Sequence, residues 1–198
     1  YRGGEPEVGK TYGLSTDAKG ENGLILAIEA EVFPASGKRE ERDNPAVLGT
    51  VQKSVKENAF LAKEFLRKYC PNINTFDIDV HMISPIEGSD VEEQKPSGFS
   101  PGLAITLSIA SALGKIPLNP NICMTGRIEL KSGLAGLVGG IHPKRGSGKI
   151  DVAADEGFKK IVIPEMGFEL LKRDFNDYVD AIRGRGTEII GGKNFLEY

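Results

Sequence analysis

The sequence predicts an α/β (α+β) fold, a single domain of mixed strands and helices. Aliphatic stretches with the period of a strand alternate along the chain with stretches that have the period of a helix. The 198 residues suffice for one ordinary domain with a substantial core. No repeat, low-complexity block or linker divides the chain. We therefore expect one domain over residues 12–198, preceded by a lead-in over residues 1–11 that continues from a longer chain.

In the first half of the chain, the apolar residues change their period from one segment to the next. Residues 23–32 are almost continuously aliphatic and predict a strand that Pro34 closes. Residues 46–68 carry apolar side chains at helical spacing and predict a long helix. Residues 76–82 alternate between apolar and polar and predict a half-buried strand. The charged segment 36–44 is typical of a solvated loop.

The second half begins with a long polar loop over residues 84–99. A nearly uniformly apolar segment over residues 103–113 then predicts a buried helix. Further strands are expected over residues 121–130, 134–138, 160–163 and 187–190, and further helices over residues 150–156 and 168–183.

The composition argues against several classes of protein. A formal net charge of −3 argues against generic nucleic-acid binding. Cys70 and Cys123 lie far apart and form no C-x-x-C pair, which argues against a disulfide scaffold and a cysteine zinc site. The chain has two histidines, His81 and His142, too few for a histidine-rich metal centre. No apolar run reaches the roughly 18 residues that cross a bilayer. We expect no signal peptide, and the reduced cysteines fit the cytoplasm or an organelle matrix.

Residues 4–11, GEPEVGKT, match the pattern of a phosphate-binding loop. Such a loop needs a strand before it and a helix after it, because the helix N-terminus and the backbone N–H groups hold the phosphates. Only three residues precede Gly4, and the residues after Thr11 show no helical apolar period. Glu5 and Glu7 would also repel phosphate. We interpret this segment as the lead-in and expect no nucleotide site.

Ser100 stands where a polar, glycine-flanked loop meets the apolar helix. The simplest interpretation is a capped helix, with Ser100 as N-cap and Pro101 at the first helical position. The functional interpretation is a nucleophile. A hydroxyl at a helix N-terminus lies beside backbone N–H groups and the positive end of the dipole, which can stabilise an oxyanion.

A serine nucleophile needs a base. His81 lies in the middle of a predicted strand and His142 in a glycine-rich turn, so neither has a recognisable triad context. A lysine base must be neutral, and burial must lower its pKa from about 10.4 toward 7 to 8. Lys144 lies in a turn and Lys149 at a predicted helix start, where a positive charge is unfavourable. Each alone is also compatible with a solvated turn lysine.

Together these segments resemble the proteolytic domain of Lon, an ATP-dependent protease family with a Ser-Lys dyad. The family's serine motif, close to P-K-D-G-P-S-A-G, corresponds to Gly98-x-Ser100-x-Gly102. Five further matches follow in the family's order: Gly114 to Pro117 (G-K-I-P), Met124-Thr125-Gly126, Leu137 to Gly140 (L-V-G-G) with a lysine after it, Ala153-Ala154 with Gly157, and Ile161 to Pro164.

The sequence departs from the family at several positions. Phe99 and Pro101 flank the serine, and Pro101 removes a backbone N–H beside the oxyanion. Arg127 replaces the family's acid after Met-Thr-Gly. The loop before the serine is longer and more acidic, through Glu87, Asp90, Glu92 and Glu93.

About five extra residues separate Gly140 from the next helix, and they leave two candidate bases. Lys144 keeps the family's spacing from the glycine pair, and Lys149 keeps its register with the helix. Insertions fit more easily into a loop than into a helical turn, which favours Lys149.

The resemblance implies a serine endopeptidase that hydrolyses peptide bonds in proteins. Ser100 would be the nucleophile, Lys149 or Lys144 the base, and Thr125 would orient the lysine. It implies the C-terminal part of an ATP-dependent protease, a hexameric ring and unfolded or damaged protein substrates. No cofactor is expected in this domain, since ATP and Mg would bind an AAA+ module elsewhere in the full chain. The alternative is a catalytically silent Lon-like domain that acts as an assembly or binding module.

Overall fold

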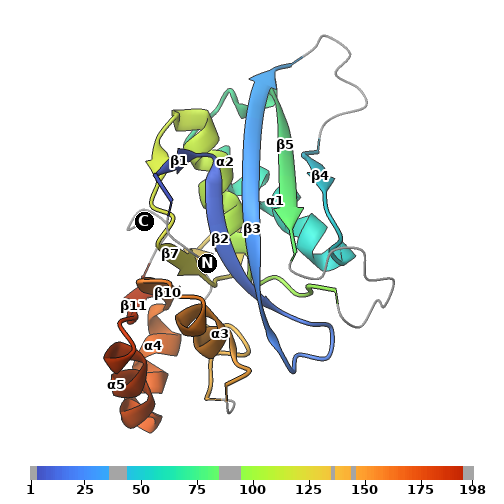
Figure 1. The fold of residues 1–198 in the computed structure, drawn as a ribbon. Coiled ribbons are helices and arrows are strands. Elements are labelled where there is room, and N and C mark those ends of the chain that lie inside the picture. The colour runs from blue at the N-terminus through green and yellow to red at the C-terminus, as the bar shows by residue number, and fades with distance from the viewer. Residues whose placement is uncertain (1–3, 36–43, 85–94, 135–136, 144–145, 194–198) are drawn as a thin grey trace.

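A mixed sheet forms the centre of the molecule (Figure 1). The computed structural model describes residues 4–35, 44–84, 95–134, 137–143 and 146–193. Over these residues seven strands form the sheet, in the order β11 (Glu188–Gly192), β10 (Lys160–Pro164), β7 (Ile122–Met124), β2 (Lys10–Thr16), β3 (Gly23–Pro34), β5 (Phe76–Ile83) and β4 (Ala46–Leu48). Strands β2, β3 and β5 pair antiparallel, and the other neighbours pair parallel. The fold class that the sequence predicts is confirmed.

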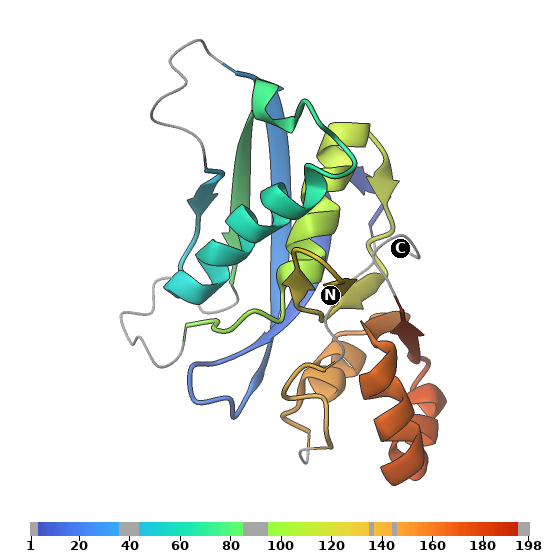
Figure 2. The ribbon, with the colours of Figure 1, turned by 180° about the vertical axis from the view of Figure 1, so that it is seen from behind.

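Two short ribbons and several helices surround this sheet. The ribbons pair β1 (Glu7–Val8) with β6 (Pro117–Leu118), and β8 (Ile128–Glu129) with β9 (Gly133–Leu134). The helices are α1 (Lys53–Leu66), a 3-10 turn (Ile73–Thr75), α2 (Gly102–Gly114), α3 (Lys149–Asp155), α4 (Glu165–Asp174) and α5 (Asn176–Gly184). Figure 2 shows α1 and α2 lying across one face of β3 and β5, while α4 and α5 gather around β10 and β11.

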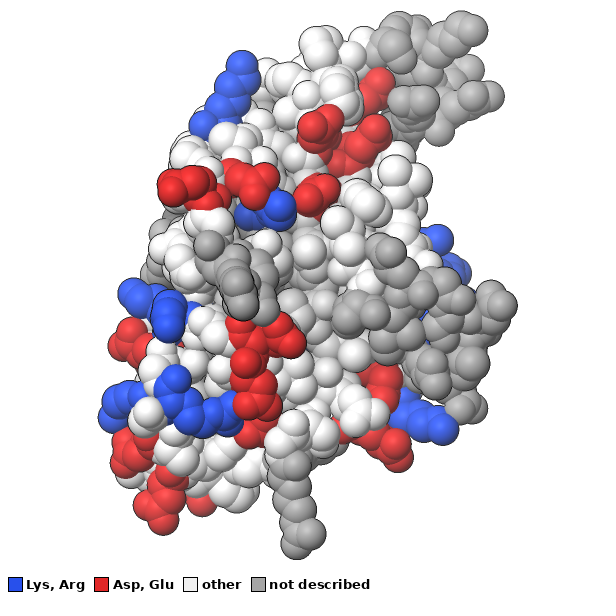
Figure 3. Space-filling model, viewed as in Figure 1, with Lys and Arg blue, Asp and Glu red and all other residues white. Residues whose placement is uncertain are grey.

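The alternation of side chains along each strand divides the core into two layers. Leu26 and Ile28 of β3 face the layer that contains α1 and α2. Tyr12 and Leu14 of β2 face the other layer, together with apolar residues of α3, α4 and α5. On the exposed part of β3 and β5, acidic side chains gather instead, as Figure 3 shows. Each buried face therefore follows from the two-residue period of its strand.

The backbone pairing between neighbouring strands is shortest in the middle of the sheet. Strand β10 pairs with β7 over three registered residues, whereas β2 meets β7 only at Gly13 and Met124. The antiparallel pair β2–β3 then continues over the whole of β2. Two well-paired halves of the sheet thus meet along a short contact between β2 and β7.

The helix expected over residues 46–68 begins later, at Lys53. Residues 46–48 form strand β4 instead, which pairs parallel with the edge of β5. The chain then turns at Gly49, whose φ is +121° and where a Cβ would lie 2.1 Å from the Met82 carbonyl oxygen. Pairing with the edge of the sheet and the turn at Gly49 therefore decide the conformation here, although the first apolar residues have helical spacing.

Two other expected elements are interrupted. The strand expected over residues 121–130 divides into β7 and β8, because residues 125–127 leave the sheet. Of the strand expected over residues 134–138, Leu134 lies in β9 and residues 137 and 138 are irregular, while residues 135 and 136 fall outside the described residues. The helix expected over residues 168–183 is two helices that break at Phe175, where φ is −142°. The other expected strands and helices are confirmed, with ends shifted by a few residues.

Residues 7, 8, 10 and 11 of the segment interpreted as a lead-in lie in strands of the fold. Strand β2 runs without a break from Lys10 to Thr16, so the boundary set between residues 11 and 12 falls inside a strand of the central sheet. Thr11 is buried, and its hydroxyl donates to the Ala104 carbonyl oxygen at 3.0 Å. No helix follows the glycine-lysine pair, so the arrangement that a phosphate-binding loop needs is not formed.

Candidate active site

A cleft of about 470 Å³ opens where α2 and α3 begin. Its walls come from the β2–β3 hairpin, the turn before α2, the glycine pair before α3, and the first residue of α3. The lining residues are Thr16, Gly20, Ser97, Gly98, Phe99, Ser100, Arg127, Leu137, Val138, Gly139, Gly140 and Lys149. Ser100 and Lys149, which lie far apart in the sequence, therefore face the same cleft.

The turn before α2 presents the Ser100 side chain to the cleft. Helix α2 begins at Gly102 with Pro101 at its N-cap, so the expectation that Ser100 caps the helix is wrong by one residue. The proline ring cannot donate a hydrogen bond, and it fits the non-helical turn that precedes the first helical residue. Freed from capping, the Ser100 hydroxyl donates to the Leu14 carbonyl oxygen of β2 at 3.2 Å.

The main chain of Ser100 is held by the segment that interrupts the expected strand. The Gly126 N–H donates to the Ser100 carbonyl oxygen at 2.7 Å, and the Thr125 hydroxyl donates to the same oxygen at 3.4 Å. Gly126 also accepts from the Leu103 N–H at 2.8 Å. Residues 125 and 126 therefore leave the strand, because their polar groups bond to the turn that carries Ser100.

Lys149 is the first residue of α3, and its side chain is buried, with 2% of the residue exposed. Its Nζ donates to the Thr125 hydroxyl oxygen at 3.4 Å, and its N–H donates to the Gly140 carbonyl oxygen at 3.2 Å. Gly140 has a φ of +75°, and a Cβ there would lie 3.3 Å from Lys149 Cε. A glycine is thus needed both for this turn and for the passage of the lysine side chain.

Thr125 joins the two candidate catalytic residues. It is fully buried, and its hydroxyl oxygen accepts from Lys149 while its hydroxyl hydrogen points to the Ser100 carbonyl oxygen. A hydroxyl has one hydrogen to donate, so these two bonds fix its direction. The Thr125 N–H in turn donates to the Val162 carbonyl oxygen of β10 at 2.9 Å. The position of the lysine amine is therefore tied to the central sheet.

The start of α3 is anchored from both sides. Strand β3 approaches it so closely that a Cβ on Gly23 would lie 2.8 Å from backbone atoms of Gly148 and Lys149. From α5, the Tyr178 hydroxyl donates to the buried Asp151 carboxylate at 2.9 Å. Burial and the bond to this carboxylate raise the pKa of Tyr178 above its usual range. None of these contacts could be predicted from the amino-acid pattern, since they join segments that no local pattern relates.

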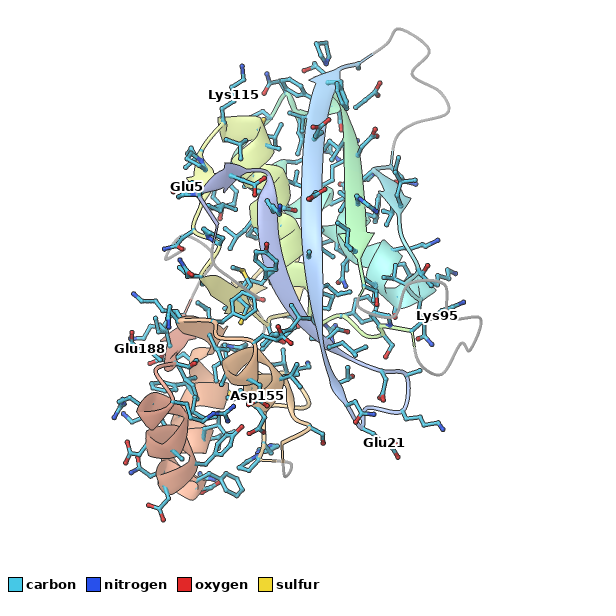
Figure 4. The ribbon with its side chains drawn as sticks, in the orientation of Figure 1. Glu5, Glu21, Lys95, Lys115, Asp155 and Glu188 are labelled. Carbon is cyan, nitrogen blue, oxygen red and sulfur yellow. The ribbon has the colours of Figure 1, made fainter. Side chains whose placement is uncertain are left out.

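The β2–β3 hairpin forms one wall of the cleft and carries its own buried acid. Figure 4 labels Glu21 in the turn of this hairpin and Asp155 on the neighbouring α3. Asp17 accepts hydrogen bonds from the Glu21 N–H and from the Asn22 side chain. Burial alone would raise the pKa of the Asp17 carboxyl, but these bonds outweigh it and hold that pKa below its usual range.

Several sequence-predicted residues lie outside this cleft or outside the description. Lys144 and the acidic residues Glu87, Asp90, Glu92 and Glu93 fall outside the described residues. His81 lies exposed on β5, 3.9 Å from Glu29, and the His142 ring packs against Phe175. Neither histidine lines the cleft. Within the described part of the chain, Lys149 is the lysine that the cleft contains.

The helix does not offer the oxyanion donors that the sequence suggested. The Gly102 N–H donates to the Phe99 carbonyl oxygen at 3.1 Å, and the Leu103 N–H donates to Gly126. Pro101 has no N–H to donate. The N–H groups of Gly102 and Leu103, the first two of α2, are therefore engaged within the structure.

Neither a metal site nor a membrane span is found over residues 4–193, apart from the undescribed gaps. No group of three His, Cys, Asp or Glu side chains is arranged there to hold a metal ion. None of the helices in this part of the chain combines the length and the hydropathy needed to cross a bilayer.

Comparison with known proteins gives a consistent result. The family described as the Lon protease (S16) C-terminal proteolytic domain matches residues 2–187. An archaeal Lon protease from Methanothermobacter thermautotrophicus is 28% identical over 180 residues, which are 89% of this chain and 25% of that protein. Lon protease 2 of Bacillus subtilis is 30% identical over an alignment of 208 residues, gaps included, which covers 98% of this chain and 33% of that protein.

A Lon protease from Rickettsia felis is 32% identical over 173 residues, which are 85% of this chain and 20% of that protein. The chain thus spans between a fifth and a third of the length of these three relatives. The predicted class, a serine peptidase domain, is confirmed by the family match. The chain belongs to the family of Lon protease C-terminal proteolytic domains.

Proposed function

We propose that this domain hydrolyses peptide bonds in proteins, with Ser100 as the nucleophile and Lys149 as the general base. The observation that supports this assignment most directly is the link through Thr125. The Thr125 hydroxyl bonds both to Lys149 Nζ and to the main chain of Ser100, and both candidate residues line one cleft. A nucleophile, a base and a group that orients the base are the parts such a reaction requires.

The surroundings of Lys149 favour a neutral amine. The residue is 2% exposed, and burial penalises the charged form of a lysine. It is also the first residue of a helix, where the positive end of the dipole disfavours an ammonium. Because the Thr125 hydrogen is directed to Ser100, Lys149 donates one N–H to the threonine oxygen. In a neutral amine the lone pair is the group that accepts the proton.

The reaction begins when the Ser100 hydroxyl turns from the Leu14 carbonyl oxygen toward Lys149. Lys149 takes the hydroxyl proton while Ser100 Oγ forms a bond to the peptide carbonyl carbon. The tetrahedral intermediate collapses, the C–N bond breaks, and the lysine ammonium gives its proton to the departing amine. Water then attacks the acyl-enzyme, with Lys149 again accepting the proton, and Ser100 is restored.

The oxyanion is assigned to the N–H of Ser100 itself. The neighbouring donors of Gly102 and Leu103 are engaged within the structure, and Pro101 has none. The Ser100 N–H belongs to the turn that carries the nucleophile, so it stays close to the reacting carbonyl throughout acylation.

We further propose that the complete protein is an ATP-dependent protease with an AAA+ module that binds ATP and Mg. It would assemble as a hexameric homo-oligomer, degrade unfolded or damaged proteins and operate in the cytoplasm or an organelle matrix. The relatives described above are all Lon proteases, which supports this proposal. The domain that we propose includes the whole of β2, which starts at Lys10, and so begins before residue 12.

Active-site labelling tests the assignment. A fluorophosphonate probe should modify Ser100, and Ser100→Ala should not be labelled. Lys149→Gln should reduce the labelling rate by about 10²- to 10⁴-fold, because the proton acceptor is lost. Lys159→Gln, which changes an exposed lysine on the surface, is the matched control and should label at the original rate.

Lys144→Gln decides between the two lysines. If this variant loses labelling while Lys149→Gln keeps it, Lys144 is the base and the assignment is wrong. If no probe modifies the folded chain, the domain is the catalytically silent module that the sequence left as the alternative. Circular dichroism confirms in each case that the variant is folded.

A further inference from the structure

We propose that Arg127 selects substrates that carry an aspartate or glutamate side chain beside the scissile bond. This inference rests on the proposed function and adds to it the class of peptide that the site prefers. It starts from the position of Arg127, which directly follows the segment that holds the nucleophile and itself lines the cleft.

The backbone fixes where the Arg127 side chain starts. Its neighbour Gly126 bonds through its N–H to Ser100 and through its carbonyl to Leu103, so residue 126 is held against the nucleophile's turn on both sides. A Cβ on Gly126 would lie 2.5 Å from a methyl group of Leu134, which leaves the main chain little freedom there. Arg127 therefore emerges at a fixed distance from the reacting serine.

The side chain is then directed along the ring of Phe99. The guanidinium carbon lies 5.7 Å from the ring centroid of Phe99, the residue before the nucleophile. Such stacking over an aromatic face favours an arginine and leaves its N–H groups directed outward. Within the described residues, no carboxylate lies within 4.0 Å of this guanidinium, although Arg127 is exposed.

The charges around the cleft favour an acidic ligand. Arg127 and Lys149 are the ionisable residues among those that line it, and the described lining contains no carboxylate. With Lys149 neutral, Arg127 supplies the positive charge that a substrate meets in the cleft. A planar guanidinium binds a carboxylate through two parallel N–H donors, which lysine does not reproduce.

Phe99 and Arg127 also line a second groove, of about 720 Å³, which α1 and β8 form together with the apolar residues Phe60, Leu61 and Leu130. Glu57 and Glu129 line this groove and offset the charges of Arg127 and Lys131, whereas the lining of the cleft contains no carboxylate, so a negative side chain is less favourable in the groove than in the cleft. The charge preference is therefore expected at the cleft side of Arg127, next to Ser100.

Matched quenched fluorescent peptides test the proposal. The peptides differ only by glutamate, glutamine or lysine at the residues that flank the cleavage site. We expect the glutamate peptide to be cleaved with a kcat/KM about fivefold above the glutamine peptide, the effect of a solvent-exposed ion pair. The preference should shrink as salt is added, because exposed charges are screened.

Three variants establish that Arg127 is responsible. Arg127→Gln should abolish the preference for glutamate, and Arg127→Glu should reverse it in favour of lysine. Lys172→Glu is the matched control, because Lys172 also lies over a phenylalanine ring, 5.3 Å from the Phe168 centroid, but on α4 away from the cleft. This control should keep the original preference.

Binding separates failure of this inference from failure of the proposed function. Fluorescence anisotropy measures the affinity of the same peptides, labelled but uncleaved, for the Ser100→Ala chain. Cleavage without any dependence on Arg127 would overturn the inference and leave the peptidase assignment intact. Arg127-dependent binding of the glutamate peptide, with no cleavage by the unmodified chain, would refute the assignment and support the inference. Absence of both would overturn both.

Discussion

The close contact between β3 and α3 predicts that Gly23→Ala will impair catalysis without changing a residue that lines the cleft. The added Cβ would lie 2.8 Å from backbone atoms of Gly148 and Lys149. Ordinary contact begins near 3.4 Å, so the start of α3 must move by at least about 0.6 Å. No flexible side chain can give way, because all three of the nearest atoms belong to the backbone.

This displacement sets the expected magnitudes. Overpacking of this kind typically costs about 1–3 kcal/mol of unfolding free energy. Misplacing a catalytic group by about 1 Å costs about 10²-fold in rate, so we expect labelling of Ser100 to slow by about 10- to 100-fold. The rate falls because Lys149 Nζ moves from the Thr125 hydroxyl that orients it.

Urea unfolding and probe labelling measure the two effects on the same protein. Because the chain has no tryptophan, far-UV circular dichroism is the suitable signal for unfolding. Gly184→Ala is the control, since a Cβ there meets nothing within 4 Å. Unchanged stability together with an unchanged labelling rate in Gly23→Ala would refute the reasoning, because the helix start would then tolerate a methyl group.

Three further predictions concern buried titratable groups. Burial raises the pKa of the Cys123 thiol far above its usual range, so a thiol reagent should modify Cys70 in the folded chain and Cys123 only after unfolding. The lowered pKa of Asp17 means that its ionised form stabilises the fold above about pH 3.8 and that this contribution is lost as the pH falls through the folded-state pKa. Urea unfolding of Asp17→Asn should therefore show a weaker acid dependence than the original chain, and an equal dependence would contradict the assignment. Tyr178→Phe should lower the unfolding free energy by about 1–2 kcal/mol, because the buried Asp151 carboxylate loses a donor, and an unchanged urea midpoint would count against that role.

The elements with a strong period could be predicted from the sequence. The aliphatic run of β3 and the alternation of apolar and polar residues in β5 are patterns of strands with one or two buried faces. Helix α2 is apolar all round because it is buried. Strand β2 could not be predicted, because its buried polar residues interrupt the apolar pattern. The Thr11 hydroxyl donates to Ala104 of α2, and the Ser15 hydroxyl donates to the Ser97 carbonyl oxygen.

The candidate site could be predicted where the residue types of a single segment indicate its chemistry. Ser100, with Lys149 or Lys144 as its base, is indicated by the residue types near two helix starts and by the order of the family's motifs. The contacts that position them do not, because Leu14, Gly23 and Asp151 act through tertiary distances. The break between β7 and β8 also escaped prediction, since the apolar pattern around it is that of a continuous strand.

The short contact between β2 and β7 has a mechanical consequence for the site. The Ser100 hydroxyl donates to Leu14 of β2, whereas Thr125 follows β7 and its N–H donates to Val162 of β10. The two halves of the sheet that meet at Gly13 and Met124 thus hold different parts of the proposed catalytic site. Both hydrophobic layers bridge this contact, because Met124 packs in the layer of Leu26 and Ile28, and Cys123 packs in the layer of Tyr12 and Leu14. On the proposed assignment, the alignment of Ser100 with Lys149 therefore depends on side-chain packing across β2 and β7 as well as on their short backbone pairing.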